Sequence, residues 1–494
     1  MSTPPDVVIC GAGAAGLTLA IELARRGVAF RLVEQRDQPF HGSRGKGIQP
    51  RSQEMFEDMG IVNRLFAAGG TYPVSRVHRA DGGSVDTAIL EGAAATPAEP
   101  YRLPLMVPQF LTEAVMRDRL MELGHRVEFG HALTGFDQDA DGINVRLATP
   151  SGEQAFRTRY LIGADGGRSF VRQALGMGFP GTTLGVRAVV ADIVLHGLPR
   201  DAWHNFNEED MAQRISLCPL MGTELFQLQA PVPLEGEVDL SATGLDAMLR
   251  ERTGRDDLSV QSVSWASAYR MNARLADHYR AGRVFLVGDA AHTHPPTGGQ
   301  GLNTSAQDAY NLGWKLASVL QGAPDALLDT YEEERRPIAA SMLGLATKLL
   351  DHARRGDHRR GREVQQLDLE YRDSSLSLPA EPRDGHIMPG DRAPDALLRG
   401  AGGQALRLFD VFRGTHWTLL GYAADRSIAP SRGGLQVHVI SQAGELRDTG
   451  GHFADAYGME PGEWVLVRPD GYVAAVVGED RIDALARHFE LHAP

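Results

Sequence analysis

The stretch DVVICGAGAAGLTLAIELARRGVAFRLVE, residues 6–34, decides the fold of this 494-residue chain. Its first five residues are rich in Val and Ile, which is typical of a buried parallel strand. A glycine loop follows, and then an Ala- and Leu-rich helical segment (14–26) that Gly27 ends as a C-terminal cap. Residues 29–34 form a second apolar run, so the stretch predicts a strand–helix–strand unit with two parallel strands.

The loop of this unit is GAGAAG, and its three glycines have separate physical roles. Gly11 permits a tight turn, Gly13 lets the backbone approach a pyrophosphate, and Gly16 lets the helix pack closely on the strand. The start of the helix offers free N–H groups and a partial positive charge to phosphates. Glu34 ends the second strand, where a carboxylate can accept hydrogen bonds from a ribose. The loop predicts a bound dinucleotide; a glycine turn without ligand is the alternative, and NAD is not separated from FAD.

Two further loops, far along the chain, also bring small residues to the end of an apolar strand. In YLIGADGGRSFVR (160–172), the strand delivers Asp165 to a Gly-Gly turn. In VFLVGDAAHTHPPTGGQGLN (284–303), Asp289 follows a strand at the edge where open α/β sheets bind ligands. A helix that starts near Leu302 can direct its dipole at a ring that becomes anionic on reduction. Each loop alone has a ligand-free explanation, but together they predict one extended ligand with a flavin ring.

The composition limits the class of protein. Hydrophobic residues make up 43% of the chain and charged residues 23%, which is typical of a soluble globular protein of two or three domains. The net charge of −13 argues against nucleic acid as the main partner. Cys10 and Cys218 form no disulfide framework, which fits a reducing cytoplasm. We expect no signal peptide in MSTPPDVVIC, and no apolar run reaches the length of a membrane span.

The three loops resemble those of the class A flavoprotein monooxygenases, the para-hydroxybenzoate hydroxylase-like aromatic hydroxylases. The glycine loop, the pair Asp165–Gly166 and the pair Gly288–Asp289 stand in that family's order. The resemblance covers about residues 5–350 and includes SRGKGIQPRS, VPQFLTE and YEEERRP. It implies an oxidoreductase that binds FAD, takes electrons from NADPH or NADH and consumes O2. It further implies hydroxylation of a phenolic or polycyclic aromatic substrate through a flavin C4a-hydroperoxide.

The resemblance also implies roles for individual residues. The expected catalytic residues are Pro296, whose backbone carbonyl would lie near the reacting oxygen, and Arg44, which would take part in movement of the flavin. No second glycine fingerprint is present for the nicotinamide cofactor, as in that family. The residues expected to bind the cofactor are Gly11, Gly13, Ala15, Gly16, Glu34, Arg44, Gln109, Asp165, Asp289, Pro296, Gly301, Leu302 and Asn303.

The domain organisation is predicted to be discontinuous, within an α/β fold class. A glutathione-reductase-like Rossmann domain for FAD would comprise residues 1–180 and 270–388. Strand-like segments between Pro and Gly turns indicate an inserted, mainly antiparallel β-sheet domain for the substrate over residues 181–269. Residues 389–494 begin near PGDRAPDALL and resemble the thioredoxin-like tail of polyketide-tailoring hydroxylases, rifampicin monooxygenase and phenol hydroxylase. This tail contains no cysteine, so we expect it to serve packing or oligomer contact.

The substrate is expected between the flavin and the inserted sheet. Its candidate lining residues are Trp203, Phe206, Phe226 and Met271. Core packing explains each of them equally well. His292 and His294 flank a threonine, but no Cys or carboxylate set with ligand spacing accompanies them, so we expect a structural role and no metal.

Other functions stay open at this point. Baeyer–Villiger insertion of oxygen or epoxidation can occur on the same scaffold, and a flavoprotein without catalysis, acting as a redox sensor, would carry the same loops. A flavin-dependent halogenase is disfavoured because the chain has no WxWxIP-type signature. The catalytic base, the choice between NADH and NADPH, and the oligomeric state, monomer or homodimer, are likewise open.

Overall fold

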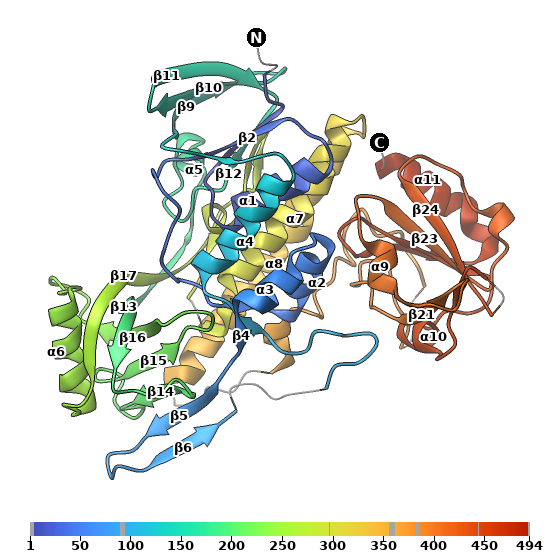
Figure 1. The fold of residues 1–494 in the computed structure, drawn as a ribbon. Helices are drawn as coiled ribbons and strands as arrows, with labels where there is room; N and C mark the ends of the chain where they lie inside the picture. Colours follow the sequence, from blue (N-terminus) through green and yellow to red (C-terminus); the bar gives the residue numbers. More distant parts are fainter. Residues whose placement is uncertain are drawn as a thin grey trace.

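The computed structural model describes residues 4–88, 94–295, 297–354, 361–381, 383, 385–442 and 444–492 (Figure 1). The predicted α/β class is confirmed, because parallel and antiparallel sheets alternate with long helices along the chain. Among the described residues, we find no helix with both the length and the apolar character needed to cross a bilayer.

The opening stretch folds as the predicted parallel unit. It consists of β1 (Val7–Cys10), α1 (Ala14–Arg25) and β2 (Phe30–Glu34), and all four residues of β1 are buried. β1 also pairs in parallel with β12 (Tyr160–Gly163), which in turn pairs in parallel with β19 (Val284–Leu286). The carboxyl ends of these three strands therefore lie side by side, and the three glycine-containing loops leave the sheet at one edge.

The same six-stranded sheet, with the order β18-β19-β12-β1-β2-β8, is covered by long helices. Figure 1 shows α1, α4, α7 and α8 grouped at the centre of the molecule. α7 can approach α1 closely because it carries Gly313, where a Cβ would lie 2.6 Å from the Cβ of Glu22. The remaining elements of this region are β18 (Arg280–Ala281), β8 (Val127–Phe129), α2 (Pro50–Asp58), α3 (Val62–Ala68), α4 (Gln109–Glu122), α5 (Phe170–Ala174), α7 (Gly301–Leu320) and α8 (Asp329–Arg354).

Two small sheets border this layer. One is an antiparallel meander at the top of Figure 1, and the other joins the segment after Arg44 to the segment before α4. Their strands are β9 (Ala132–Gln138), β10 (Ile143–Thr149) and β11 (Gly152–Thr158), and then β3 (Gly47–Ile48), β7 (Leu105–Met106) and β4 (Gly70–Thr71).

An eight-stranded, mainly antiparallel sheet stands beside the helical layer. One of its faces packs on α6 (Ala242–Thr253) around a hydrophobic core that includes Leu245 and Leu249. The sheet also takes strands from before residue 89 and after residue 290, and the pair β14 and β5 is parallel. In spatial order its strands are β20 (His292–Thr293), β17 (Ser259–Leu275), β13 (Gly181–His196), β16 (Phe226–Val232), β15 (Ile215–Pro219), β14 (Ala202–Phe206), β5 (Val74–His78) and β6 (Ser84–Thr87).

The last hundred residues form a separate lobe, at the right of Figure 1, around a seven-stranded mixed sheet. A hydrophobic core of its own fills one side, and Trp417 on the other side packs edge-to-face against Trp314 of α7. Its elements are β21 (Leu397–Gly400), β22 (Ala405–Arg407), α9 (Leu408–Phe412), β23 (Trp417–Tyr422), β24 (Leu435–Ile440), β25 (Leu446–Arg447), α10 (His452–Tyr457), β26 (Glu463–Val467), β27 (Val473–Val477) and α11 (Ile482–His492).

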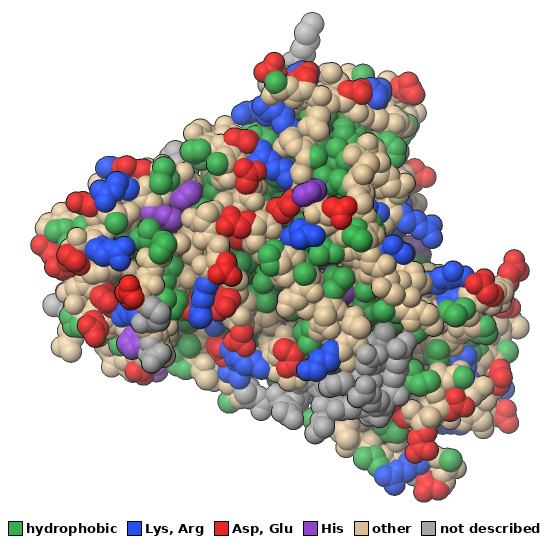
Figure 2. All heavy atoms as spheres, turned by 180° about the vertical axis from the view of Figure 1, so that it is seen from behind, with side chains coloured by type: hydrophobic (Ala, Val, Ile, Leu, Met, Phe, Trp, Pro, Cys, Tyr) green, Lys and Arg blue, Asp and Glu red, His purple; other side chains and the backbone are tan. Residues whose placement is uncertain are grey.

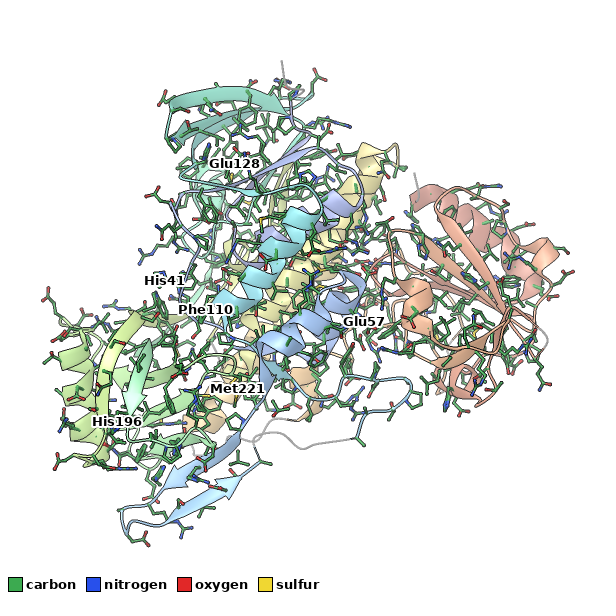
Figure 3. The ribbon with its side chains drawn as sticks, viewed as in Figure 1. His41, Glu57, Phe110, Glu128, His196 and Met221 are labelled. Atoms are coloured by element: carbon green, nitrogen blue, oxygen red, sulfur yellow. The ribbon has the colours of Figure 1, made fainter. Side chains whose placement is uncertain are left out.

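Ion pairs join this lobe to the helical layer. Glu57 of α2 lies where the helical layer meets the lobe (Figure 3) and pairs with Arg407 at 2.9 Å and Arg413 at 3.3 Å. Deeper in the interface, Glu334 of α8 pairs with Lys315 of α7 and with Arg468 of the lobe, and all three side chains are fully buried.

Candidate functional site

A cavity of about 1500 Å³ lies between the carboxyl ends of β1, β12 and β19 and one face of the eight-stranded sheet. It takes its walls from the three loops, from the start of α7, and from β13, β16 and β17. The structure therefore brings together segments that lie up to about 290 residues apart in sequence. The predicted cofactor residues that line it are Gly11, Gly13, Ala15, Glu34, Arg44, Gln109, Asp165, Asp289, Gly301 and Leu302.

Two other predicted cofactor residues, Gly16 and Asn303, do not line the cavity. A Cβ on Gly16 would lie 1.9 Å from the carbonyl oxygen of Gly11, so Gly16 serves the packing of α1 on the loop. Asn303 is completely buried, where its Nδ2 donates to the carbonyl oxygens of Gly47 at 2.8 Å and Gly299 at 2.7 Å. Asn303 thus ties the loop after Arg44 to the start of α7. Pro296 lies outside the described residues.

The glycine loop has the shape that its sequence predicts. Gly11 has a φ of +105°, and a Cβ there would lie 2.2 Å from the carbonyl oxygen of Ala164. The Ala12 N–H donates to Oε2 of Glu34 at 3.0 Å, so the carboxylate at the end of β2 braces the loop. Gly13 precedes α1, and no side chain caps the helix there. The N–H groups of its first turn are therefore available to an anion in the cavity.

Buried polar atoms in the cavity wall test whether a polar ligand fits. Asp165 Oδ1, Thr293 Oγ1 and His294 Nε2 are buried and have no hydrogen-bond partner among the described residues, and all three side chains line the cavity. Each such atom costs about 1–3 kcal/mol when it stays unsatisfied. A ligand with hydroxyl and amide groups would remove this cost. Together with the glycine loop, the wall fits an extended dinucleotide.

The two histidines of the third loop have different surroundings. His292 is fully buried, and its Nε2 bonds Asp308 at 2.6 Å, while Nε of Arg335 donates to the same carboxylate at 2.8 Å. His294 places Nδ1 at 3.1 Å from the carbonyl oxygen of Pro295, which makes Nδ1 the donor and leaves Nε2 as an acceptor. His292 therefore belongs to a structural ion cluster, whereas His294 borders the cavity. Within the described ranges, no three His, Cys, Asp or Glu side chains gather as a metal site.

The alternation of side chains along each strand shows which candidate substrate residues face the core and which face the cavity. Phe226 alternates with Gln227 along β16, and Phe206 alternates with Asn205 along β14. Both phenylalanines point to the core beneath α6 and do not line the cavity. Trp203 lies on the other face, beneath Lys46, whose Nζ is 4.0 Å from the ring centroid. Met271 alone of the four lines the cavity.

The cavity face of the sheet is polar, and its residues were not singled out in the sequence. Their signal is visible in FQLQAPV, residues 226–232, where glutamines alternate with apolar residues, and in AVVADIVL, residues 188–195, where a carboxylate interrupts an apolar strand. The polar group comprises Ser43, Lys46, Asp192, Gln227 and Gln229. Burial raises the pKa of Asp192, and the Ser43 hydroxyl and N–H, together with the nearby Lys46, oppose that rise.

Arg44 projects into the same cavity from the loop that precedes β3. Its side chain is exposed, and the guanidinium lies 5.6 Å from the ring of Phe40 and 5.9 Å from the ring of Trp265. Tyr269 of β17 also lines the cavity, and burial raises its pKa to about 12 although Arg44 lowers it. Tyr269 is therefore a protonated hydroxyl, able to donate a hydrogen bond, at every physiological pH.

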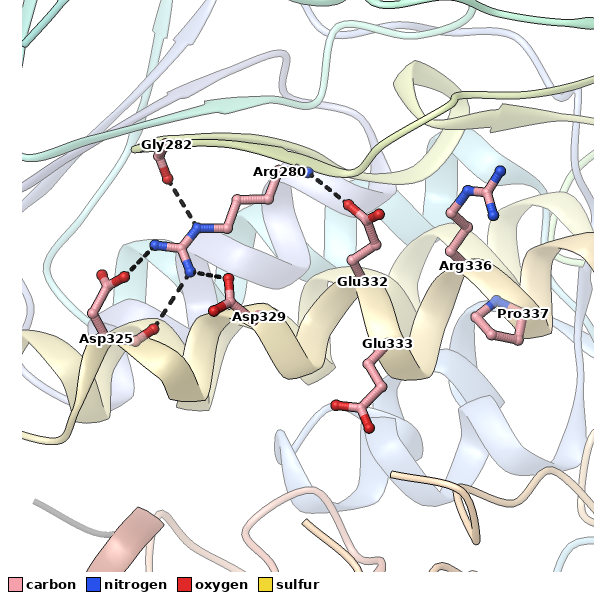
Figure 4. Close-up of a pocket in the computed structure, with 8 residues that line it drawn as sticks. All are labelled: Arg280, Gly282, Asp325, Asp329, Glu332, Glu333, Arg336 and Pro337. Carbon is pink, nitrogen blue, oxygen red and sulfur yellow. Dashed lines mark hydrogen bonds and ion pairs between the residues drawn. The ribbon is translucent and has the colours of Figure 1, made fainter. Parts of the chain in front are cut away.

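A second pocket of about 720 Å³ lies away from this edge, along α8 (Figure 4). Arg280 pairs there with Asp325 at 2.5 Å and with Asp329 at 2.6 Å, and its backbone N–H donates to Glu332 at 3.3 Å. These acceptors satisfy Arg280, and Arg336 donates to the carbonyl oxygen of Ala276 at 3.1 Å, so we assign the pocket a structural role in holding β18 on α8.

Because Glu113 of α4 is buried, we expect the free energy of unfolding of the protein to depend on pH. Glu113 is almost fully buried behind Gly13, and burial raises its pKa from 4.5 to about 7 although Gln109 donates to it at 2.8 Å. Between these values the folded protein holds a proton that the unfolded chain has lost, so the free energy of unfolding falls as the pH rises through this window. The Glu113→Gln variant should be more stable than the parent protein at pH 8, by up to about 3 kcal/mol, with a smaller difference at pH 5.

Urea unfolding at the two pH values measures this difference. Asp118→Asn, on the exposed side of the same helix, is the control and should leave the free energy of unfolding unchanged at both pH values. Equal effects of Glu113→Gln at both pH values would contradict a protonated Glu113.

Known proteins resemble this chain along its whole length. Residues 5–346 match the family described as FAD binding domain, and residues 386–490 match that described as aromatic-ring hydroxylase, C-terminal. A flavin-dependent monooxygenase of Mycobacteroides abscessus is 41% identical, over 97% of this chain and 99% of its own. A rifampicin monooxygenase of Streptomyces venezuelae is 34% identical, over 98% and 97%. The solved structure of aklavinone-11 hydroxylase with FAD and aklavinone has a TM-score of 0.85 at 27% identity and covers 100% of both chains.

Proposed function

Since the chain belongs to the FAD-dependent aromatic-ring hydroxylases, we propose that it hydroxylates a polycyclic phenol with electrons from NADPH or NADH. It is a flavin-dependent aromatic monooxygenase, and O2 is its co-substrate. One observation carries the proposal: the glycine loops and the polar sheet face enclose a single cavity. Its volume of about 1500 Å³ exceeds the roughly 300–1000 Å³ of an ordinary ligand pocket, which leaves room for a cofactor and a multi-ring substrate together.

We assign the cofactor to the helical side of the cavity. Gly11 and Gly13 would hold the pyrophosphate at the start of α1, and the Glu34 carboxylate would accept hydrogen bonds from the ribose hydroxyls. Asp289 would bind the sugar-alcohol chain, and Gly301 and Leu302 at the start of α7 would lie along the ring. When bound, FAD supplies the acceptor for the hydride of NAD(P)H and the site at which O2 is activated.

We assign the substrate to the sheet side of the cavity. Met271 would contact its rings, while Tyr269 and Gln229 would bind its oxygen atoms. Arg44, which lines the same cavity, would lie between the two ligands and would hold negative charge during reduction. We also propose that the backbone carbonyl of Pro296 lies near the reacting oxygen, as the family resemblance implies. The protein's part would be to orient the ring and, with both ligands in the cavity, to keep water away from the reactive oxygen.

The domain assignment is part of the proposal. Residues 1–180 and 270–388 would form the cofactor domain, residues 181–269 the substrate domain, and residues 389–494 a thioredoxin-like domain. The parallel pair β23 and β24, followed by the antiparallel β26 and β27 and the helix α11, supports the last assignment. Without cysteine in it, this domain would serve packing.

The proposed partner is a small molecule. Acidic and basic side chains are interspersed over the face shown in Figure 2, and the chain has a net charge of −13, so we do not assign it a nucleic-acid or membrane surface. We propose that it acts in the cytoplasm, where NAD(P)H is available, as a monomer or homodimer.

Stopped-flow reduction of the bound flavin by NADPH tests this function. With a panel of polycyclic phenols, we expect at least one compound to accelerate reduction by about tenfold or more, equivalent to about 1.4 kcal/mol of barrier. The product of that compound should carry a new hydroxyl on a ring carbon. A lactone or an epoxide would instead support Baeyer–Villiger or epoxidising chemistry. Reduction that no aromatic compound accelerates would support a redox sensor and contradict the proposal.

A further inference from the structure

The loop that carries Arg44 is fastened to the substrate side of the cavity at Ser43. The Ser43 N–H donates to Oδ2 of Asp192 at 2.7 Å, and the Ser43 hydroxyl donates to Oδ1 of the same residue at 2.5 Å. Asp192 lies on β13 and is completely buried. One buried carboxylate therefore uses both oxygen atoms to hold the residue next to Arg44.

A second fastening acts on the other side of Arg44. Nζ of Lys46 donates to Oε1 of Gln227 at 2.7 Å, and Nε2 of Gln227 donates to the hydroxyl of Ser43 at 2.9 Å. Gln227 lies on β16, directly opposite Asp192 in the register of the sheet. The residues on either side of Arg44 are thus bound to two neighbouring strands.

The opposite edge of the loop is fastened to the cofactor side. The Gln109 N–H donates to the carbonyl oxygen of Gly45 at 2.9 Å, and the Val107 N–H donates to that of Lys46 at 3.0 Å. Nδ2 of Asn303 donates to the carbonyl oxygen of Gly47 at 2.8 Å. Residues 43–47 therefore connect the eight-stranded sheet to the first turns of α4 and α7.

The surface next to the fastening is the surface proposed to receive the substrate. Val190 lies two residues before Asp192 on β13, and Gln229 lies two residues after Gln227 on β16, so all four side chains share one face. Val190 and Gln229 both line the cavity. Nε2 of Gln229 also donates to Oε1 of Gln227 at 2.6 Å, which links the cavity wall to the fastening directly.

We propose that Asp192 is a positioning residue that makes reduction of the flavin depend on bound substrate. A substrate ring that contacts Val190 and Gln229 restricts the positions of the side chains on this face of the sheet. The hydrogen bonds of Asp192 and Gln227 to Ser43 then restrict the position of the neighbouring Arg44. Arg44 would then be held towards the cofactor side of the cavity during reduction. This role rests on the proposed function, because it concerns the substrate of that same site.

The Asp192→Asn variant tests this role. The amide keeps the size of the carboxylate but offers one acceptor oxygen in place of two. We measure the ratio of the flavin reduction rates with and without an activating phenol. We expect this ratio to fall by about tenfold or more, towards one, equivalent to about 1.4 kcal/mol of coupling. The FAD content should stay as in the parent enzyme, because the glycine loop is unchanged. Ser43→Ala removes the hydroxyl contacts to Asp192 and Gln227 but keeps the Ser43 N–H on Asp192, so it should give an intermediate ratio.

A control separates positioning from simple loss of stability. Asn205 is buried on β14 of the same sheet, where its Nδ2 donates to the hydroxyl of Ser75 at 3.0 Å, and no recorded hydrogen bond among the described residues joins it to residues 43–47. Asn205→Ala should lower stability yet keep the parent ratio. An unchanged ratio in Asp192→Asn, or an equal fall in Asn205→Ala, would overturn the role of Asp192.

Hydrogen–deuterium exchange gives a readout that needs no reaction. In protein without substrate, peptides that cover residues 40–47 should exchange faster in Asp192→Asn than in the parent, while peptides of α11 stay unchanged. Unchanged exchange at 40–47 would show that the fastening does not hold the loop, whatever the substrate is. Faster exchange in an enzyme that no phenol activates would contradict the proposed function alone.

Discussion

We expect the Gly11→Ala variant to purify without bound FAD. A methyl group at this position would lie 2.2 Å from the carbonyl oxygen of Ala164, and the φ of +105° is strained for a residue with a side chain. The loop between β1 and α1 must then move, and the N–H groups of the first turn of α1 no longer converge on the pyrophosphate. The expected loss of FAD affinity is about 100-fold or more, equivalent to about 2.7 kcal/mol.

The ratio of flavin to protein absorbance and a titration of FAD into flavin-free protein measure this loss. Gly27→Ala is the matched control, because Gly27 also has a positive φ, of +69°, yet no described atom lies within 4 Å of its added Cβ. It should keep full FAD affinity and lose only about 1 kcal/mol of stability. Normal flavin content in Gly11→Ala, or flavin loss in both variants, would contradict the assignment of this loop.

Replacement of Glu334 should have the largest effect on stability. Its carboxylate accepts hydrogen bonds from Nζ of Lys315 at 2.6 Å and from the guanidinium of Arg468 at 2.5 and 2.9 Å, and all three side chains are fully buried. These two cations hold the pKa of Glu334 below its usual range although burial opposes them. Glu334→Ala would leave Arg468 with Asp470 and would remove the one carboxylate that pairs with Lys315 among the described residues. The expected cost is about 3–5 kcal/mol.

Urea unfolding measures this cost, and limited proteolysis should show the C-terminal lobe cleaved first, because Glu334 joins α8 to that lobe. Glu445 is the control: it pairs with Arg426 on the surface, so Glu445→Ala should change stability by less than about 1 kcal/mol. The folded fraction of Glu334→Ala should retain its turnover rate, since Glu334 does not line the cavity. A loss no larger than that of Glu445→Ala would show that the cluster does not hold the lobe.

The cofactor side of the site could be predicted from sequence because its signals are local. Val7–Cys10, Gly11 and Glu34 lie within thirty residues of one another, and each acts through its backbone shape or through its place at a strand end. The convergence of the second and third loops on the first followed from the parallel pairing rule, which places the carboxyl ends of parallel strands at one edge.

The substrate side could be predicted only in part. Alternation along residues 226–232 would have placed Phe226 in the core and the two glutamines on the opposite face of the sheet, where Gln229 lines the cavity, but residue type alone favoured the aromatic side chain. The bond between Ser43 and Asp192 spans 149 residues, and no local pattern indicates such a partner. The buried carboxylate in residues 188–195 signals that a partner must exist, yet not which residue it is.

The buried cluster of Glu334, Lys315 and Arg468 and the strands β5 and β6 could not be predicted either, because their partners also lie far away in sequence. Arg468 lies 134 residues from Glu334, and both are ordinary charged residues in their own segments. Residues 74–87 join the edge of the eight-stranded sheet through β14, more than 120 residues away. Their membership of the sheet depends on tertiary pairing and not on their own sequence.

The most direct test of the central claim is the fate of molecular oxygen. The flavin-loaded enzyme, NADPH and an activating polycyclic phenol are incubated under ¹⁸O₂, and the product is analysed by mass spectrometry. The account predicts a product with one ¹⁸O atom in a new ring hydroxyl, formed in proportion to the NADPH consumed. A product with oxygen from water, or consumption of NADPH that yields only hydrogen peroxide with every phenol tested, would contradict it.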